Sequence, residues 1–372
     1  MAETIEREIG SNGKQQTSRI RRIALIVAGL AFIIAALAAE GFSLVLARYA
    51  ETPFKPGERP VLVNIGKGLG LSGIAQELAE AGVIDKPKYF SLIGRIRRMQ
   101  KLVKAGEYSL SAAMTPSEIL DLLVSGRAVL YRITVPEGFT VTEIADLAVK
   151  LGMSRRGEFL NLCFDPMFTR GLGVDAESLE GYLYPDTYLF PRGVGAKAVI
   201  TTMVARFFQV FTPAMEKRAE DLGLTMGEAV TLASIIQKES GAHSELPLIS
   251  SVFHNRLKKG MRLQSDPTVI YGIENFDGNI TRRHLTTPTP YNTYTIAGLP
   301  PGPIANPGKE ALMAALYPAQ SRYLFFVSRG NGTHEFSRTL SEHNLAVRNY
   351  QLRKGSQPDT KGEPSEGSEN TP

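Results

Sequence analysis

The sequence has a single cysteine, Cys163, and this scarcity excludes several kinds of site. One thiol cannot form an intramolecular disulfide, and the CxxC pairs that hold zinc or carry redox chemistry are absent as well. Cys163 lies in the apolar stretch FLNLCFDPMF. We therefore predict a buried thiol without a chemical role.

Other catalytic signatures are also missing. The chain has no HExxH, no GxSxG and no phosphate-binding P-loop. His254, His284, His334 and His343 lie far apart and have no carboxylate at ligand spacing, so we predict no metal and no cofactor. The formal charge of +5 is small and spread out, which argues against a nucleic-acid partner. Acid–base chemistry by carboxylates remains.

An apolar run near the N-terminus predicts contact with a lipid bilayer. The run 23-IALIVAGLAFIIAALAA-39 has seventeen uncharged residues, and 42-FSLVLA-47 extends it. This is close to the length of about 20 residues that spans a bilayer. We predict a single transmembrane anchor over residues 20–47. A cleaved signal peptide, with Ala36 and Ala38 at its A-x-A site, is the competing interpretation.

Arginines before the run predict its orientation. Arg19, Arg21 and Arg22 precede the apolar residues, and positive charge favours the cytoplasmic side. Residues 1–19 are then predicted to be a cytoplasmic tail, with the bulk of the chain on the other side of the membrane.

Two polar segments flank the ordered part. Residues 48–60, RYAETPFKPGERP, hold three prolines and mixed charge, so we predict a semi-rigid linker. Residues 354–372 hold no aliphatic or aromatic side chain and are predicted to be a disordered tail.

An internal repeat organises the part after the linker. Segment 63-VNIGKGLGLSGIAQELAEAGV-83 aligns with 133-ITVPEGFTVTEIADLAVKLGM-153, and 108–126 is a partial third copy. Each copy predicts a short strand, a glycine turn and an amphipathic helix. Ser72 and Thr142 are candidate N-caps, and Gly82 and Gly152 candidate C-caps.

The repeat leads to a prediction of the fold class. Its strand–turn–helix start resembles a LysM module, a family that binds N-acetylated glycans. We predict an α+β protein with one transmembrane helix, a small LysM-like α/β module over 61–130, and a mixed helical and β catalytic domain over 131–350. A purely structural spacer is the alternative for residues 61–130.

The stretch 225-TMGEAVTLASIIQKES-240 predicts a helix with a carboxylate at its end. Thr225 and Glu228 form a capping-box pattern. Leu232, Ile235 and Glu239 stand at i, i+3 and i+7, so Glu239 continues the apolar stripe. Burial and the negative end of the helix dipole both raise the pKa of such a carboxyl, which favours a proton donor. A glutamate turned into solvent is the alternative.

Four further segments carry aromatic, helical, turn or hairpin signals. In 179-LEGYLYPDTYLFP-191, three tyrosines either line a sugar groove or belong to the core. A helix is predicted over 245–260, and 291–308 is a long irregular segment of the kind that is often functional. Residues 323–336 predict a hairpin with an RGNG turn.

These segments together resemble the YceG-like endolytic murein transglycosylases over roughly residues 60–350. The matching stretches are LEGYLYPDTY (179–188), ASIIQKES (233–240), SVFHNRLKKGMRLQSDPTVIYG (251–272), TPYNTYTIAGLPPGPIANPG (289–308) and FFVSRGNGTHEFS (325–337). The family's motif usually reads like ASI-(V/I)-E-K-E, and this chain has Gln237 at the first acidic position. The resemblance therefore implies Glu239 as the catalytic acid and base.

The resemblance also implies a reaction, a substrate and partners. It implies non-hydrolytic cleavage of the β-1,4 bond between N-acetylmuramic acid and N-acetylglucosamine in peptidoglycan glycan strands, beside cell-wall synthases such as penicillin-binding proteins. A muramidase-type hydrolase using Glu239 with Glu245 or Asp266, and a non-catalytic glycan-binding scaffold, are the alternatives. Glu245 is either a partner of Glu239 or a cap of the next helix, and we favour the cap. The candidate substrate-binding residues are Glu245, Asp266, Tyr271, Tyr291, Asn292, Thr293, Tyr294, Tyr184 and Asp186.

Overall fold

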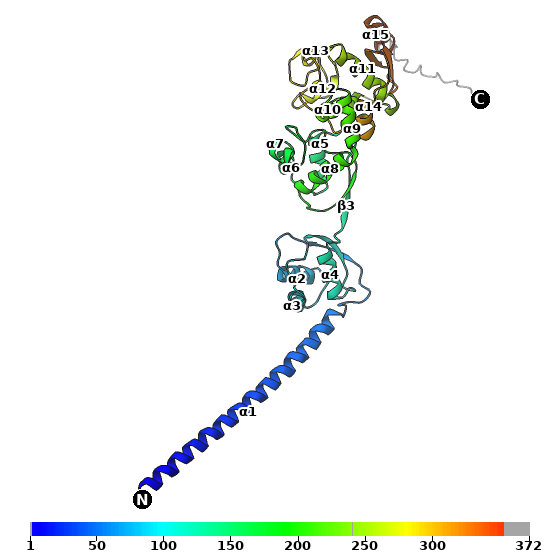
Figure 1. The fold of residues 1–372 in the computed structure, drawn as a ribbon. Coiled ribbons are helices and arrows are strands. Elements are labelled where there is room, and N and C mark those ends of the chain that lie inside the picture. The colour runs from blue at the N-terminus through cyan, green and yellow to red at the C-terminus, as the bar shows by residue number, and fades with distance from the viewer. Residues whose placement is uncertain (1, 240, 353–372) are drawn as a thin grey trace, which may run out of the picture. The chain divides into compact units, whose positions relative to one another are not determined.

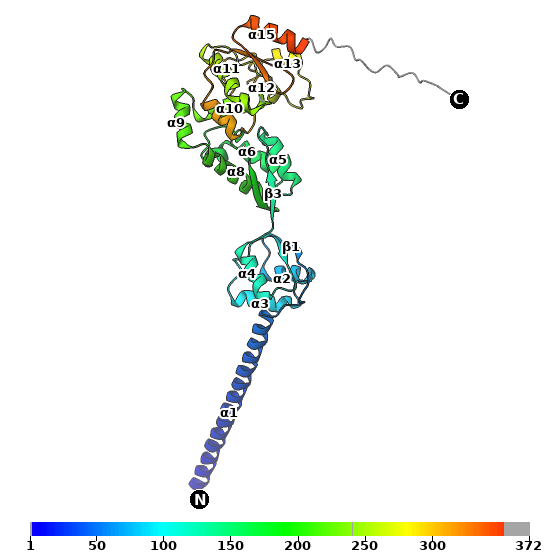
Figure 2. The ribbon, with the colours of Figure 1, turned by 90° about the vertical axis from the view of Figure 1, so that its right-hand side faces the viewer.

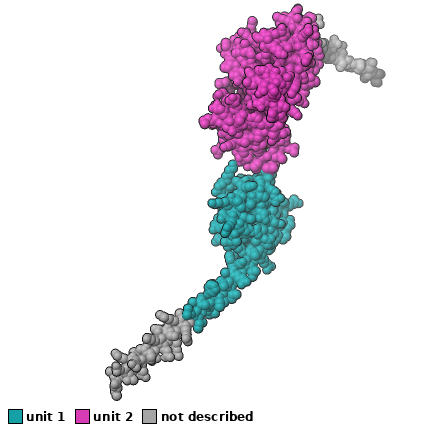
Figure 3. All heavy atoms as spheres, viewed as in Figure 1, with its two compact units in different colours: residues 1–129 teal, residues 130–372 magenta. Residues whose placement is uncertain are grey.

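The computed structural model describes residues 2–239 and 241–352, with side chains from residue 25 to 239 and from 241 to 351. The chain divides into two compact units, residues 1–129 and 130–372, which are coloured separately in Figure 3. Each unit has its own hydrophobic core.

Helix α1, Ala2–Ala50, is a long helix that leads into the first unit (Figure 1). Its segment Leu25–Ala50 has a mean hydropathy of 2.3 in an 18-residue window and none of that window is buried. Phe32, for example, is 75% exposed. Within the described residues α1 is the one unbroken helix that is long and apolar enough to cross a bilayer, which is compatible with a membrane anchor.

The end of α1 belongs to the core of the first unit. Leu46, Tyr49 and Ala50 are buried there, and the Tyr49 hydroxyl donates to the carbonyl of Lys86 at 3.3 Å. The residues that follow are also tied to the unit, because the N–H of Lys55 donates to the carbonyl of Ala112 at 2.9 Å. The first residues of the predicted semi-rigid linker, 48–50, therefore belong to α1, and the linker over the rest of 48–60 stays a prediction.

The first unit is a small α+β fold. Its elements are β1 Val61–Ile65, α2 Leu71–Glu80, α3 Pro87–Ile96, β2 Gly106–Leu110 and α4 Pro116–Ser125. The strands β1 and β2 pair antiparallel, with Val61 opposite Leu110. Their inward side chains pack on the three helices.

The predicted repeat is present in the backbone. Strand β3, Leu130–Thr134, and helix α5, Val141–Lys150, reproduce β1 and α2 in the second unit. Gly68 and Gly138, at φ +83° and +76°, make the same turn. In this region of φ a side chain is disfavoured, so glycine is required.

The ends of the repeat helices agree with the sequence in part. Gly82 and Gly152 follow α2 and α5 at φ +72° and +66°, as expected of C-cap glycines. The prediction of Ser72 and Thr142 as N-caps is wrong. Both helices begin earlier, with Gly70 and Thr140 as N-caps. The LysM likeness itself stays a prediction.

The second unit is mostly helical and holds two short two-stranded sheets. Strand β3 pairs antiparallel with β4, Thr187–Pro191, and β5, Phe325–Ser328, with β6, His334–Ser337. The helices after α5 are α6 Arg156–Cys163, α7 Pro166–Gly171, α8 Ala196–Val210, α9 Pro213–Asp221, α10 Met226–Glu239, α11 Leu246–Lys258, α12 Asp266–Tyr271, α13 Arg282–Thr286, α14 Lys309–Leu316 and α15 Leu340–Val347, with a 3-10 turn at His243–Glu245 and a π-helix at Arg348–Leu352. Helix α10 packs against α9, α11, α12 and α14 (Figure 2).

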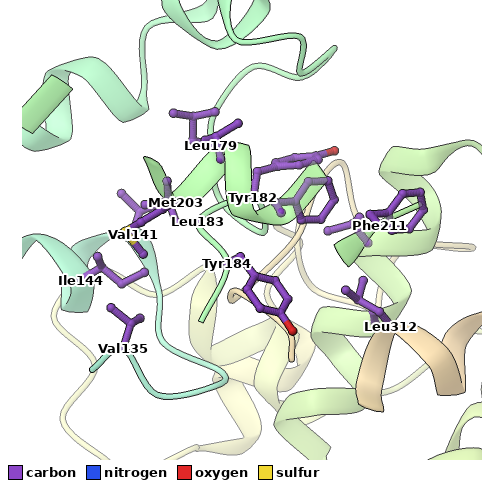
Figure 4. Packing of buried hydrophobic residues seen from close by; sticks show 14 of the residues in the cluster. Val135, Val141, Ile144, Leu179, Tyr182, Leu183, Tyr184, Met203, Phe211 and Leu312 are labelled. Carbon is purple, nitrogen blue, oxygen red and sulfur yellow. The ribbon is translucent and has the colours of Figure 1, made fainter. Parts of the chain in front are cut away.

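The tyrosines of the LEGYLYPDTY stretch belong to this core. Tyr182, Tyr184 and Tyr188 are 1%, 7% and 8% exposed, and the first two lie among apolar side chains in Figure 4. The core interpretation is therefore the correct one of the two. Cys163 is 0% exposed, which confirms the buried thiol.

Candidate active site

Helix α10 carries Glu239 to the surface of the core. Its start is the predicted capping box, in which the N–H of Thr225 donates to Glu228 Oε2 at 2.8 Å and the N–H of Glu228 donates to Thr225 Oγ1 at 3.1 Å. Leu232 and Ile235 are 0% exposed. The stripe that they form ends at Glu239, which is half-buried.

Glu239 lines a cleft of about 500 Å³ in the second unit. Its walls come from α10, α11, the segment before α12, the 291–308 segment, the hairpin β5–β6 and α15. The lining residues are Glu239, Arg256, Leu263, Gln264, Asp266, Tyr294, Phe325, Phe326, Val327, Ser328, His334, Leu340, His343, Val347 and Gln351. The cleft thus combines carboxylates, a cation and apolar or aromatic surface, as sites for organic ligands do.

The surroundings of Glu239 favour its protonated form. The Ser265 hydroxyl donates to Glu239 Oε1 at 2.5 Å. Burial raises the pKa of Glu239 to about 7. The hydrogen bond from Ser265 opposes this shift of the pKa, the nearby charge of Asp266 adds to it, and Arg256 opposes it. A carboxyl with a pKa near neutrality can both give and take a proton.

A strained residue places Ser265 against Glu239. Gln264, just before Ser265, has φ +52°, a conformation that costs most L-residues about 1 kcal/mol or more. Two hydrogen bonds to Thr293 hold this conformation. The N–H of Gln264 donates to the Thr293 carbonyl at 3.2 Å, and the N–H of Ser265 donates to the Thr293 hydroxyl at 3.0 Å. Strain of this kind concentrates at functional sites.

Arg256 joins the hairpin to the same segment. It is 7% exposed, and its guanidinium donates from Nε to the carbonyl of Leu324 at 2.6 Å and from NH1 to the carbonyl of Leu263 at 2.7 Å. It also lies over the ring of Phe325 at 5.2 Å. Arg256 therefore fixes the positions of two walls of the cleft and adds a positive charge near Glu239.

Asp266 and Tyr294 stand beside Glu239 in the cleft. The Tyr294 hydroxyl donates to Asp266 Oδ1 at 2.6 Å. Burial, and then the hydrogen bond to Asp266, raise the pKa of the Tyr294 hydroxyl, which stays neutral. The structure thus brings three of the residues singled out in the sequence, Glu239, Asp266 and Tyr294, into one cleft.

Comparison with known proteins assigns this arrangement to a family. A family model described as the YceG-like family matches residues 63–349, well over half of the chain. The chain belongs to the YceG-like family. Among its relatives is the endolytic murein transglycosylase of Bacillus subtilis strain 168, which is 32% identical over 318 residues, 80% of this chain and 86% of that protein.

Two other matches are consistent with this assignment. The endolytic murein transglycosylase of Streptococcus pneumoniae serotype 2, strain D39, is 28% identical over 322 residues, 76% of this chain and 58% of that protein. A crystal structure of a yceG-like protein from Listeria monocytogenes matches with a TM-score of 0.55 and 34% identity, over 77% of this chain and 98% of that one.

Asn292 and Thr293 of this YceG-like chain support the cleft from behind. Both are 0% exposed and neither lines the cleft, so their contact with a substrate stays a prediction. The Asn292 amide donates to the carbonyl of Thr287 at 2.7 Å and accepts from the N–H of Tyr294 at 2.9 Å. These bonds fix the loop that places Tyr294.

Tyr271 and Tyr291 also lie outside the lining of the cleft. Their rings pair at 4.9 Å between centroids, and the Tyr271 hydroxyl donates to Glu180 Oε2 at 3.2 Å. They pack against the core of the second unit, so we assign them a role in positioning α12 and the 291–308 segment.

Glu245 has neither of the two roles weighed from the sequence. It occupies the N-cap position of α11, but its side chain makes no capping hydrogen bond, so the favoured prediction of a side-chain cap is wrong. Its carboxylate accepts instead from the N–H of His334 at 3.0 Å and contacts His334 Nδ1 at 2.8 Å. Because His334 lines the cleft, Glu245 fixes the hairpin wall.

Tyr184 and Asp186 are not part of the site. Asp186 pairs with Arg206 at 2.8 Å, and Arg206 also lies over the Tyr184 ring at 5.9 Å. Neither residue lines the Glu239 cleft. The prediction that Tyr184 and Asp186 bind substrate is therefore corrected, because core packing and this ion pair occupy their side chains.

Proposed function

We propose that this chain is an endolytic lytic transglycosylase that cleaves the β-1,4 bond between N-acetylmuramic acid and N-acetylglucosamine in peptidoglycan. The observation that carries the proposal is the half-buried Glu239 in the lining of the cleft, with its pKa raised to about 7. Its support from outside the chain is the family and the two relatives named endolytic murein transglycosylase.

One carboxyl group can serve both halves of this reaction. Protonated Glu239 gives its proton to the glycosidic oxygen, and the bond between that oxygen and C1 of the muramyl sugar breaks. The C1 cation is oxocarbenium-like, and the sugar's own N-acetyl group can stabilise it. The Glu239 carboxylate then takes the proton of the muramyl C6 hydroxyl, whose oxygen closes the 1,6-anhydro ring at C1. No water is consumed, and Glu239 ends protonated as it began.

Other groups of the cleft have supporting roles in this proposal. The bond from Ser265 holds the Glu239 carboxyl in one orientation, which reduces the reorganisation needed for proton transfer. Tyr294 and Asp266 form a polar pair that can donate to or accept from sugar hydroxyl and N-acetyl groups. Phe325 and Phe326 add apolar ring surface to the lining of the cleft.

The product distinguishes this function from a hydrolase. Glycosidases that use water need a second carboxylate, and Asp266 is the candidate in this cleft, since Glu245 holds His334. We expect full-length protein in detergent to release fragments that end in 1,6-anhydro-muramic acid, read by mass spectrometry of digested peptidoglycan. Hydrated reducing ends would identify a muramidase, and no cleavage would favour a glycan-binding scaffold.

The pH dependence offers a second prediction with two opposite shifts. Because the first step needs protonated Glu239, kcat/KM should be full at low pH and fall as the pH rises through about 7. In Ser265→Ala the carboxylate loses a hydrogen bond, its pKa rises, and the falling limb moves to higher pH. In Asp266→Asn a neighbouring negative charge is removed, so the pKa drops and the limb moves to lower pH.

Non-specific damage to the cleft cannot produce both shifts. The measurement is kcat/KM over the pH range for the wild type and the two variants, with Glu220→Gln on the exposed surface of α9 as control. If kcat/KM falls at the same pH in Ser265→Ala, Asp266→Asn and the wild type, the fall is not caused by the ionisation of Glu239.

The membrane setting completes the proposal. Helix α1 would anchor the enzyme with its N-terminus in the cytoplasm and the residues after α1 outside the inner membrane, in reach of new glycan strands. Cell-wall synthases are the proposed partners, and this part rests on the family resemblance.

A further inference from the structure

The segment that includes helix α3 is unusually basic. Between Asp85 and Glu107 the chain has seven lysines or arginines and no acidic residue. These are Lys86, Lys88, Arg95, Arg97, Arg98, Lys101 and Lys104. Within the described residues only two of them take part in ion pairs, Lys86 with Asp85 at 3.9 Å and Arg97 with Glu51 and Asp121 at 3.6 and 3.9 Å. The other charges face solvent.

Exposed apolar side chains stand among these charges. Ile96 is 63% exposed and Leu102 is 54% exposed, although the opposite face of α3, with Phe90 and Ile93, is buried in the core. Arg98, at φ +58°, turns the chain sharply after α3. Isolated exposed apolar residues are ordinary, but here they are interleaved with cations on one segment.

This segment is joined directly to the apolar helix. Helix α3 packs against α1, as Figures 1 and 2 both show. Tyr89 on α3 contacts Phe42 and Tyr49 of α1 edge to face, at 6.0 and 5.6 Å between centroids. Lys86 Nζ lies over the Tyr49 and Tyr89 rings at 5.8 and 5.7 Å. Tyrosine rings with nearby lysines are the usual composition of a membrane–water interface.

We propose that this face, which we call the α3 surface (Lys86, Lys88, Tyr89, Arg95, Ile96, Arg98, Lys101 and Leu102), lies against the anionic phospholipid head groups of the bilayer that α1 crosses. We choose a lipid bilayer as the partner of this surface because α1 is one continuous helix. Its exposed apolar part leads without a break to the end that is buried in the core beside α3. Clustered cations bind anionic lipid surfaces, and flanking apolar side chains enter the interface. The inference rests on the proposed membrane anchoring by α1.

The consequence is a first unit with a fixed orientation on the membrane. Two attachments, a helix end packed in the core and a charged face on the head groups, restrict rotation more than a tether does. Side chains on the first unit are then held at a fixed distance from the bilayer surface.

The absence of tryptophan makes the test direct. The chain has no Trp, so one introduced tryptophan reports its own surroundings by fluorescence. Full-length Ile96→Trp is reconstituted into phosphatidylcholine vesicles with and without phosphatidylglycerol. Quenching is read with lipids that carry the spin label on the head group or on the acyl chain, and with aqueous iodide. Leu189→Trp, 56% exposed in the second unit, is the matched control, and Ile33→Trp, 55% exposed on α1, reports anchoring.

We expect Ile96→Trp to be quenched by head-group labels and shielded from iodide when phosphatidylglycerol is present, whereas Leu189→Trp stays open to iodide. Adding Lys88→Gln, Arg95→Gln, Arg98→Gln and Lys101→Gln should abolish the quenching, and so should high salt. If Ile96→Trp is as open as the control while Ile33→Trp is quenched by acyl-chain labels, the α3 surface proposal fails and the anchor stands. If Ile96→Trp is quenched equally in pure phosphatidylcholine, the surface binds the bilayer without a requirement for anionic lipid, and that part of the proposal fails. An unquenched Ile33→Trp overturns both.

Discussion

Glu239→Gln should reduce the rate of glycan cleavage by about 10³-fold or more, because it removes the group that we assign to both proton transfers. The variant keeps the size of the side chain, and the Ser265 hydroxyl can still donate to the amide oxygen that replaces Glu239 Oε1. The amide cannot give a proton to a glycosidic oxygen. Substrate binding and the fold should therefore survive while the chemistry stops. The measurement is single-turnover cleavage of purified glycan strands, with binding followed separately by co-sedimentation.

The matched control makes the same glutamate-to-glutamine substitution at a position where we expect no chemistry. Glu220→Gln on α9 makes an identical substitution on a side chain that is 64% exposed, and its rate should equal that of the wild type. Activity retained in Glu239→Gln would show that another group supplies the proton, with Asp266 the next candidate in the cleft. Loss of binding together with activity would show that Glu239 holds the substrate instead of reacting with it.

The parts of the fold that the sequence predicts well are those specified by local chemistry. Gly68 and Gly138 mark turns because glycine adopts their positive φ without strain, and Thr225 with Glu228 starts α10 by hydrogen bonds three residues apart. The predicted N-caps of α2 and α5 lie two residues after the observed ones. At Thr140 and Thr142 two similar side chains compete, and the position of Glu143 decides between them by completing the capping box of Thr140.

Long-range contacts explain which parts of the site remained hidden. Glu239 is visible in the sequence because it continues an apolar stripe of its own helix. Ser265 reaches it from 26 residues away, and only the left-handed backbone of Gln264 directs it there. Arg256 was visible within the HNRLKKG stretch, but nothing in its neighbours indicates that its guanidinium binds backbone carbonyls of Leu263 and Leu324.

Several polar residues that the sequence marks as candidates for substrate contact have structural partners within the chain. Asn292 and Thr293 stand in the same four-residue stretch as Tyr294, yet their side chains satisfy buried backbone groups. Gln237 is a similar case, since its side-chain oxygen accepts from the N–H of Gly308 at 3.0 Å and fixes α10 to the segment before α14. An irregular segment must satisfy its own backbone, so part of its polar composition is structural.

Glu180 is the clearest polar group that the sequence did not reveal. Its carboxyl is 2% exposed, and burial raises its pKa to about 8. The N–H of Val141 at the start of α5 donates to both oxygens at 3.1 and 3.2 Å, Asn306 Nδ2 donates to Oε1 at 3.1 Å, and Tyr271 donates to Oε2. One side chain thus joins three segments of the second unit that lie 39, 126 and 91 residues away in sequence.

Glu180→Ala should therefore destabilise the second unit by about 3–5 kcal/mol, since three buried donors lose their acceptor and a cavity remains. For a unit of this size the melting temperature should fall by roughly 10 °C. Tyr271→Phe removes one donor only and should cost about 1 kcal/mol. Thermal unfolding by circular dichroism tests the series, with exposed Glu177→Ala as the control in the same loop. If Glu180→Ala has the same melting temperature as the control, apolar contacts hold the three segments together, and the hydrogen bonds of Glu180 do not stabilise the unit.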